Sequence, residues 1–202
     1  MFNEEIKVVF MLFGSKKKKN EDGQRPIMPT RVKVIEKKEH FLQVQRTISS
    51  YSGYKGSRRK EDDLAIRRRV LEEIDKSREV LTDILEDAYN DGDTKTQQEV
   101  RKAQDQLDVF SDEVDLAESG HKYSFFSAQR SISGGMIKQL TKFDASIIDL
   151  MNQLVKAAAR VQTKYLGKDS SLSTVKELRK IKQYITTARN EFTNRIEYIK
   201  KI

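Results

Sequence analysis

The chain of 202 residues has no cysteine and no tryptophan, and it contains only two prolines and nine glycines. Without cysteine it can form neither a disulfide nor a thiolate zinc site, and it has no cysteine nucleophile. Few helix-breaking residues and a charged fraction of 35% are typical of helical bundles and coiled coils. The composition therefore predicts an all-α protein.

Long apolar runs are also missing, since the longest, residues 8–13, falls far short of the roughly 20 residues that span a bilayer. Glu4 and Glu5 stand where a signal peptide would carry positive charge. We therefore expect a cytoplasmic protein, with a peripheral membrane location as the alternative. Met11 is a second candidate start, which would place the sequence MLFGSKKKK at the N-terminus.

The usual motifs of catalytic and nucleotide sites do not occur: there is no GxxxxGK[ST], GxGxxG, HExxH or GxSxG sequence. The two histidines, His40 and His121, have no cysteine to share a metal with. The sequence predicts no catalytic residue, no cofactor, no metal site and no small-molecule substrate. We expect a protein that is not an enzyme.

Charge is divided into three blocks. Residues 1–60 carry 15 basic and 6 acidic side chains, residues 61–118 carry 8 and 19, and residues 119–202 carry 16 and 6. The net charges are thus +9, −11 and +10. Such blocks indicate either surfaces for different partners or complementary faces that meet within one chain or between copies.

Apolar residues recur every three or four positions in residues 61–90 and again in residues 93–119, which predicts two amphipathic helices. Gly92 suits the left-handed position that ends a helix, and Asp93 or Thr94 can cap the next one. We expect an acidic antiparallel hairpin. Its two apolar registers comprise Leu64, Leu71, Ile74, Leu81, Leu85 and Ala88, and Val100, Ala103, Leu107, Phe110, Val114 and Ala117.

From Met136 to Tyr165 the apolar stripe is wider, which is typical of a helix with more than one neighbour. This segment is the best candidate for the central helix of the bundle. Gly167 ends it, and a last, basic helix follows. The apolar register of that last helix comprises Leu178, Ile181, Ile185, Ala188, Phe192 and Ile199.

The predicted fold is an elongated antiparallel helical bundle, or coiled-coil hairpin, with a disordered basic N-terminal segment. Residues 1–30 form the mobile tail, and residues 31–60 form a short helix and a linker rich in Gly, Tyr and Arg. The short helix covers residues 36–51, because residues 31–35 alternate like a strand. Residues 61–202 form the bundle, divided into the acidic hairpin 61–118 and the basic helices 119–202.

An apolar stretch followed by four lysines forms the first candidate site. Near an anionic membrane each lysine contributes about 1 kcal/mol, and apolar side chains inserted beside them add to it. The same lysines suit nucleic-acid phosphates, and a solvated tail is the third alternative. The membrane or anion contact is assigned to Phe10, Leu12, Phe13, Lys16, Lys17, Lys18 and Lys19.

Residues 51–60 mix aromatic rings, glycines and cations, a combination that can stack on bases while binding phosphates. The alternative is a disordered linker that precedes an acidic helix. The residues assigned to nucleic-acid contact are Tyr51, Tyr54, Arg58, Arg59 and Lys60.

A Lys-rich apolar tip followed by long charged helices resembles, over residues 11–118, the membrane-remodelling helical hairpins of the ESCRT-III and phage-shock-protein A type. The charge order differs, because ESCRT-III proteins carry a basic first hairpin and acid toward the C-terminus. We therefore assign no family.

Two hypotheses for the function remain. The first is a non-enzymatic assembly or adaptor protein that self-associates or binds another helical protein, and that touches anionic membrane through its tip. The second is a nucleic-acid-associated protein that uses its basic N-terminal region and basic C-terminal helix.

Overall fold

The computed structural model describes residues 31–117, 124–127, 131–167 and 173–202, and the side chains of residues 39 onward within these ranges. The chain divides into two compact units, residues 1–35 and residues 36–202. The predicted mobile tail, residues 1–30, lies outside the described residues. The described part consists of five α-helices and two short 3₁₀ turns, with no strand among them, which confirms the all-α helical bundle.

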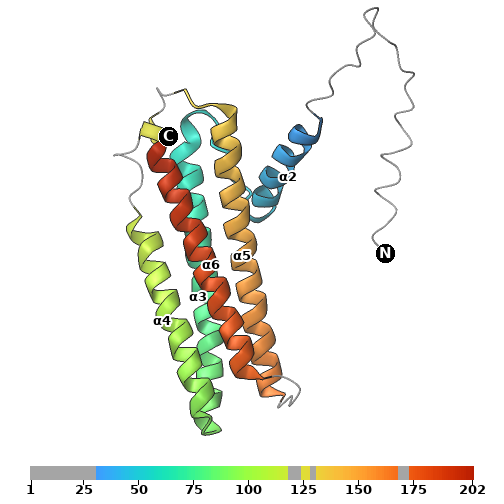
Figure 1. Ribbon diagram of the computed structural model, residues 1–202, viewed down its shortest axis with the longest axis vertical. Coiled ribbons are helices and arrows are strands. Elements are labelled where there is room, and N and C mark those ends of the chain that lie inside the picture. The colour runs from blue at the N-terminus through green and yellow to red at the C-terminus, as the bar shows by residue number, and fades with distance from the viewer. Residues whose placement is uncertain (1–30, 118–123, 128–130, 168–172) are drawn as a thin grey trace, which may run out of the picture. The chain divides into compact units, whose positions relative to one another are not determined.

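Four long helices form the bundle: α3 (Arg59–Asn90), α4 (Thr94–Leu116), α5 (Gly134–Leu166) and α6 (Thr174–Lys201) (Figure 1). Each packs on two others in the ring order α3, α4, α6, α5, so α3 lies diagonally opposite α6. The sequence led us to expect α5 in the centre, and this was wrong. Its wide apolar stripe instead faces α3, α6 and the end of α2 (Arg31–Thr47), where Val44 and the following Ile48 belong to the same apolar cluster.

The bundle has two distinct ends. At the turn end, α3 leads into α4 through a tight turn in which Gly92 has a φ of +69°, the left-handed position predicted for it. Asp93 caps α4 by accepting a hydrogen bond from the backbone N–H of Thr96. At the crossover end lie the start of α3, the 3₁₀ turn Ser124–Phe126, the start of α5 and the C-terminus (Figure 1).

The core registers of α4 and α6 are confirmed, and Leu107 and Leu154 are fully buried. In α3 the register was only partly correct. Leu64 is 44% exposed and Leu71 and Leu85 are only partly buried, whereas Ile74, Leu81 and Ala88 are fully buried together with the neighbouring Ile66, Val70 and Ile84. The segment at residues 31–35, predicted to be strand-like, is the first part of α2.

Candidate functional site

The segment that precedes α3 is folded against the bundle. Tyr51 and Tyr54 are 1% and 0% exposed. Their rings belong to a row of contacts in which neighbouring centroids lie 5.9 Å apart (Phe41–Tyr51), 5.7 Å (Tyr51–Tyr54) and 5.5 Å (Tyr54–Phe125). The two tyrosines are thus placed in the core, not on the surface where bases could stack on them, and this segment is not the disordered linker of the alternative.

The three cations assigned to the same contact have separate positions. Arg58 is exposed and forms an ion pair with Glu61, with 2.9 Å between Nε and Oε2. Arg59 is buried and donates to the backbone carbonyls of Phe125 and Ser127, both at 3.1 Å. Lys60 is half-buried and also has an interaction partner. The structure does not gather these residues into one surface.

The two tyrosines instead join a buried charge cluster, which we define as Tyr51, Tyr54, Asp63, Asp144 and Arg195. Arg195, from α6, is 0% exposed, and its three guanidinium nitrogens each have a partner. Nε donates to Asp144 Oδ1 at 2.7 Å, Nη1 lies 2.8 Å from Asp63 Oδ1, and Nη2 donates to the Tyr54 hydroxyl at 2.7 Å. The cluster therefore connects α3, α5, α6 and the loop before α3.

The charges in this cluster are balanced by Arg67, which lies beside it. Tyr51 donates its hydroxyl proton to the second oxygen of Asp144 at 2.6 Å, and Arg67 Nε lies 3.2 Å from Asp63. Two arginines thus neutralise two carboxylates, which offsets much of the cost of burying them.

Burial and ionic neighbours shift the pKa values in the cluster. Burial raises the pKa of Asp144, although Arg195 and the Tyr51 hydroxyl oppose that shift. Burial by itself would lower the pKa of Arg195, but Tyr54, Asp144 and Asp63 outweigh it and raise the pKa. Burial is the largest cause that raises the pKa of Tyr51, and the negative charge of the Asp144 carboxylate raises it further.

Most of the cluster's polar groups are directed at one another. Nε and Nη2 of Arg195 and both oxygens of Asp144 are hydrogen-bonded within the protein, and Nη1 of Arg195 is ion-paired with Asp63 without forming a hydrogen bond. We therefore interpret the cluster as a structural element that fixes the crossover end. Within the described ranges no group of three or more His, Cys, Asp or Glu side chains could hold a metal ion.

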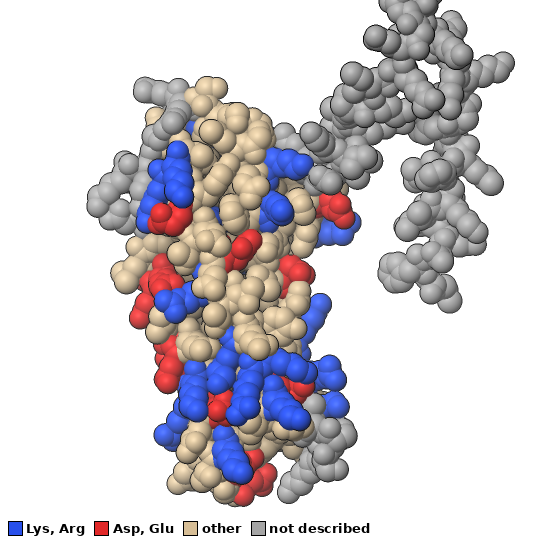
Figure 2. Space-filling model, in the orientation of Figure 1, with Lys and Arg blue, Asp and Glu red and all other residues tan. Residues whose placement is uncertain are grey.

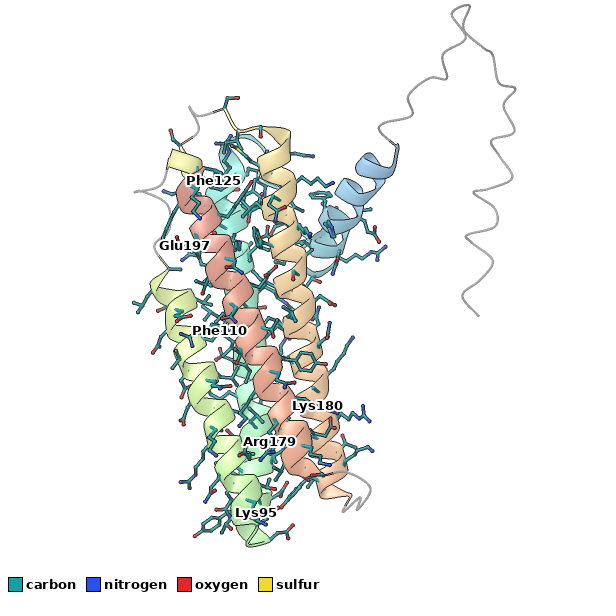
Figure 3. The ribbon with its side chains drawn as sticks, in the orientation of Figure 1. Lys95, Phe110, Phe125, Arg179, Lys180 and Glu197 are labelled. Atoms are coloured by element: carbon teal, nitrogen blue, oxygen red, sulfur yellow. The ribbon has the colours of Figure 1, made fainter. Side chains whose placement is uncertain are left out.

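A basic face lies toward the turn end, and we define it as Lys95, Lys102, Lys176, Arg179, Lys180 and Lys182. In Figure 2 Lys and Arg side chains gather over the lower half of the visible surface, and Figure 3 labels Lys95, Arg179 and Lys180 there. Arg179 and Lys182 line a shallow depression on α6 together with Gln183, Thr186 and Thr187.

Part of this positive charge is neutralised locally. Glu99 Oε2 lies 2.5 Å from Lys182 Nζ and its Oε1 lies 3.1 Å from Lys102 Nζ, and hydrogen bonds from these lysines lower its pKa. Lys180 pairs with Glu177. Lys176 and Arg179 are exposed and form no ion pair with a described carboxylate. The outer side of α6 thus presents positive charge that the bundle itself does not neutralise.

An acidic side lies on the diagonally opposite helix. Glu79, Asp83 and Glu86 are exposed on α3, and no Lys or Arg occurs between Arg78 and Lys95. Because α3 and α6 do not adjoin in the ring, their outer surfaces face away from each other.

Between adjacent helices the acidic and basic blocks meet within one chain. Arg189 of α6 forms a two-pronged ion pair with Glu113 of α4, and Lys182 of α6 pairs with Glu99 of α4. The intrachain alternative for complementary charges therefore holds for α4 and α6.

The apolar and lysine tip, from Phe10 to Lys19, lies outside the described residues. None of the described helices has the length and apolar character needed to cross a membrane.

Sequence reasoning missed Asp144 and Arg195, although a signal was present. Each stands at a core-facing position of an otherwise apolar register, Asp144 between Leu140 and Ile147 and Arg195 between Phe192 and Ile199. Two opposite charges at core positions of different helices are a pattern from which a buried ion pair could be predicted.

Comparisons of the chain with models of protein families, with curated proteins and with solved structures found no match. The fold defines the class, a four-helix bundle preceded by a short helix, and the proposals below rest on its surfaces alone.

Proposed function

We propose that this chain is a non-enzymatic assembly protein whose copies associate through surfaces of opposite charge. The acidic side of α3, with Glu79, Asp83 and Glu86, is the partner of the basic face of a second copy. The observation that carries the proposal is the diagonal placement of α3 and of the α6 part of that face, Lys176 and Arg179, since two surfaces that face apart in one molecule can meet only between molecules.

Such a contact is heterologous, because each copy offers one surface and receives the other. Heterologous contacts form rings where the rotation closes and open filaments where it does not. Exposed ion pairs are worth about 0.2–1 kcal/mol each, so several are needed and the assembly is weak. We expect self-association at tens of micromolar protein and low salt.

Sedimentation velocity at about 0.01 M and about 1 M salt tests this, because the Debye length falls from about 30 Å to about 3 Å between them. We expect larger species at low salt and monomers at high salt. A wild-type protein that is monomeric at both salt concentrations would overturn the proposal.

Charge reversal makes the test specific. The double variant Lys176→Glu/Arg179→Glu leaves each copy with two acidic surfaces, and Glu79→Lys/Glu86→Lys leaves each with two basic ones. Each variant should be monomeric by itself, whereas an equimolar mixture should associate. The control Arg68→Glu/Lys142→Glu makes the same change of net charge as Lys176→Glu/Arg179→Glu, but at exposed positions elsewhere, and it should behave like the wild type.

Binding of nucleic acid is the second candidate, and the specific observation in its favour is the exposed Arg179, which lines a depression with Gln183 and has the exposed Lys176 three residues before it on the same helix. Arg, Lys and Gln side chains commonly contact phosphate oxygens. Because Tyr51 and Tyr54 are buried, this function rests on α6 and not on residues 51–60. A filter-binding titration with duplex DNA and RNA should show affinity that falls steeply with salt and is lost in Lys176→Glu/Arg179→Glu.

A further inference from the structure

A groove of about 450 Å³ runs between the parallel helices α4 and α6, in their C-terminal halves. Its apolar lining comes from Val109, Leu116 and Ala117 of α4 and from Phe192 and Ile196 of α6. Leu116 is 76% exposed and Val109 is 45% exposed. Two large apolar side chains on one helix are therefore left open to solvent beside an apolar floor.

The floor of the groove is firmly packed. Phe192 is 2% exposed and contacts the ring of Phe110 edge-on, with the centroids 5.9 Å apart. Phe110 is itself fully buried, and Glu197 lines the groove further along α6 (Figure 3). The groove is a preformed surface, so a ligand that fills it need not reorganise the core.

The charged lining of the groove is mostly acidic: Asp112 and Glu113 come from α4 and Glu197 from α6, and Lys200 is the one cation among these lining residues. Glu113 is paired with Arg189, whereas Asp112 is exposed and forms no ion pair with a described cation. On the α6 wall, Glu197 is paired with Lys200. The unneutralised charge beside the apolar floor is therefore negative.

We propose that this groove binds a basic amphipathic helix of a partner protein. Val109 and Leu116 are seven residues apart, about 10 Å along the axis, which matches anchors at positions i, i+3 or i+4, and i+7 of a helix laid in the groove. A Lys or Arg side chain on the flank of that helix nearer α4 meets Asp112. The apolar floor supplies affinity, and the carboxylate of Asp112 sets the orientation.

A second copy of this chain does not offer such a helix among its described residues. The other exposed large apolar side chains are Leu42, Leu64, Tyr89, Met136 and Leu166, which are scattered over α2, α3 and α5. The two on α3, and likewise the two on α5, lie at opposite ends of their helix, so these side chains do not supply anchors one or two turns apart. We therefore take another protein as the occupant.

The experiment uses three synthetic helical peptides of about 18 residues, five turns each. The first has a leucine stripe and a lysine flank, the second has glutamate in place of each lysine, and the third has the composition of the first in shuffled order. Binding to the full chain is measured by fluorescence anisotropy. The first peptide should bind, and the other two should bind at least about tenfold more weakly.

Variants of the groove then locate the site. Val109→Ser/Leu116→Ser and Asp112→Lys should each weaken binding of the first peptide about tenfold or more, a loss of about 1.4 kcal/mol. The controls are Leu166→Ser, an exposed leucine elsewhere, and Glu72→Lys, an exposed acid elsewhere, and both should bind like the wild type. Unchanged urea midpoints would show that the groove variants are folded.

Three outcomes would overturn the proposal. They are no binding of the first peptide, equal binding of the shuffled peptide, and full binding to Val109→Ser/Leu116→Ser. Self-association of the wild type that is lost in Val109→Ser/Leu116→Ser but retained in Lys176→Glu/Arg179→Glu would identify a second copy as the occupant instead.

Discussion

Tyr54 has a backbone φ of +62°, in the left-handed region that residues with a side chain seldom adopt. Its surroundings hold it there. The carboxylate of Asp62 accepts hydrogen bonds from the backbone N–H groups of Ser52 and Tyr54, and the Tyr54 hydroxyl accepts one from Arg195. At the neighbouring Gly53, also with positive φ, a Cβ would lie 3.0 Å from the ring of Phe41. The turn is thus fixed by contacts to residues outside it.

Breaking the buried charge cluster should be costly. Replacing Asp144 by Asn leaves Arg195 with only Asp63 to balance its charge, and loss of one partner of a buried ion pair typically costs about 3–5 kcal/mol. Urea unfolding followed by circular dichroism measures this loss. Asp149→Asn, an exposed acid on the same helix, is the control and should stay within about 0.5 kcal/mol.

An apolar replacement of the pair provides the second comparison. In Asp144→Leu/Arg195→Met the remaining Asp63 and Arg67 still neutralise each other. The double variant should therefore be less destabilised than the sum of the single variants, by about 0.5–3 kcal/mol. Strict additivity would contradict the assigned coupling.

At the residue scale, the sequence indicated which residues are important more reliably than whether they are buried or exposed. It singled out Tyr51 and Tyr54, but it placed them on a binding loop, because the local mixture of Gly, Tyr and Arg resembles flexible nucleic-acid contacts. Their partners, Asp144 and Arg195, are 93 and 141 residues away. Separations of that size carry no local signal for the partners of the tyrosines, whereas the Asp144–Arg195 pair by itself could have been predicted from its two core positions.

The capping residue of α4 allows a prediction at the scale of the element. Asp93 Oδ2 accepts from the Thr96 hydroxyl at 2.6 Å and Oδ1 from its backbone N–H at 3.1 Å, and these hydrogen bonds lower the pKa of Asp93. Asp93→Ala should destabilise the protein by about 1 kcal/mol at neutral pH.

The pH dependence follows from the direction of that shift. A carboxylate whose folded pKa lies below its unfolded value of about 3.9 stabilises the protein above that pH, and the contribution is lost as the pH falls through the folded pKa. The difference in stability between the wild type and Asp93→Ala, measured from their urea midpoints, should thus become smaller below about pH 4. Asp93→Asn caps without titrating and is the control. A gap that stays constant with pH would argue against an ionised cap.

The existence of the long helices was predictable because the periodicity of their apolar residues and the capping residues at their ends agree. Asp93, Gly92 and Gly167 all lie at the helix boundaries where the sequence placed them. Which face of α3 is buried was less predictable, because its leucines and its β-branched residues define two overlapping apolar stripes. Packing selected the stripe with Ile66, Val70 and Ile74, which leaves Leu64 exposed.

At the scale of the whole molecule, the sequence determined how many long helices follow residue 60 but not their order around the core. A wide apolar stripe suggested a central helix. In the ring, however, every long helix has two long neighbours. The apolar stripe of α5 is wide because this helix also packs against Val44 and Ile48, which precede the bundle in the sequence. The charge blocks could be counted from sequence, whereas only the diagonal placement of α3 and α6 separates the surfaces that pair inside the chain from those left for another molecule.

The N-terminal tip provides the last prediction. We propose that Phe10, Leu12 and Phe13 enter the headgroup boundary of an anionic membrane while Lys16, Lys17, Lys18 and Lys19 lie over its surface. Burial of one aromatic side chain contributes about 2 kcal/mol, and each lysine contributes about 1 kcal/mol. Because neither half is large against the cost of immobilising the segment, both halves should be required for binding.

Liposome sedimentation with three variants tests the tip: its three apolar residues changed to Ser, its four lysines changed to Gln, and deletion of residues 1–24, which leaves all of residues 36–202 in place. All three should lose binding to anionic liposomes, whereas Lys176→Glu/Arg179→Glu, which alters only the basic face, should keep it. Wild-type protein that stays in the supernatant, or a serine variant that binds as the wild type does, would refute membrane contact. If the glutamine variant alone loses a salt-dependent interaction with DNA, the lysines act on nucleic acid, because phosphates need the charge and have no use for the apolar residues beside it.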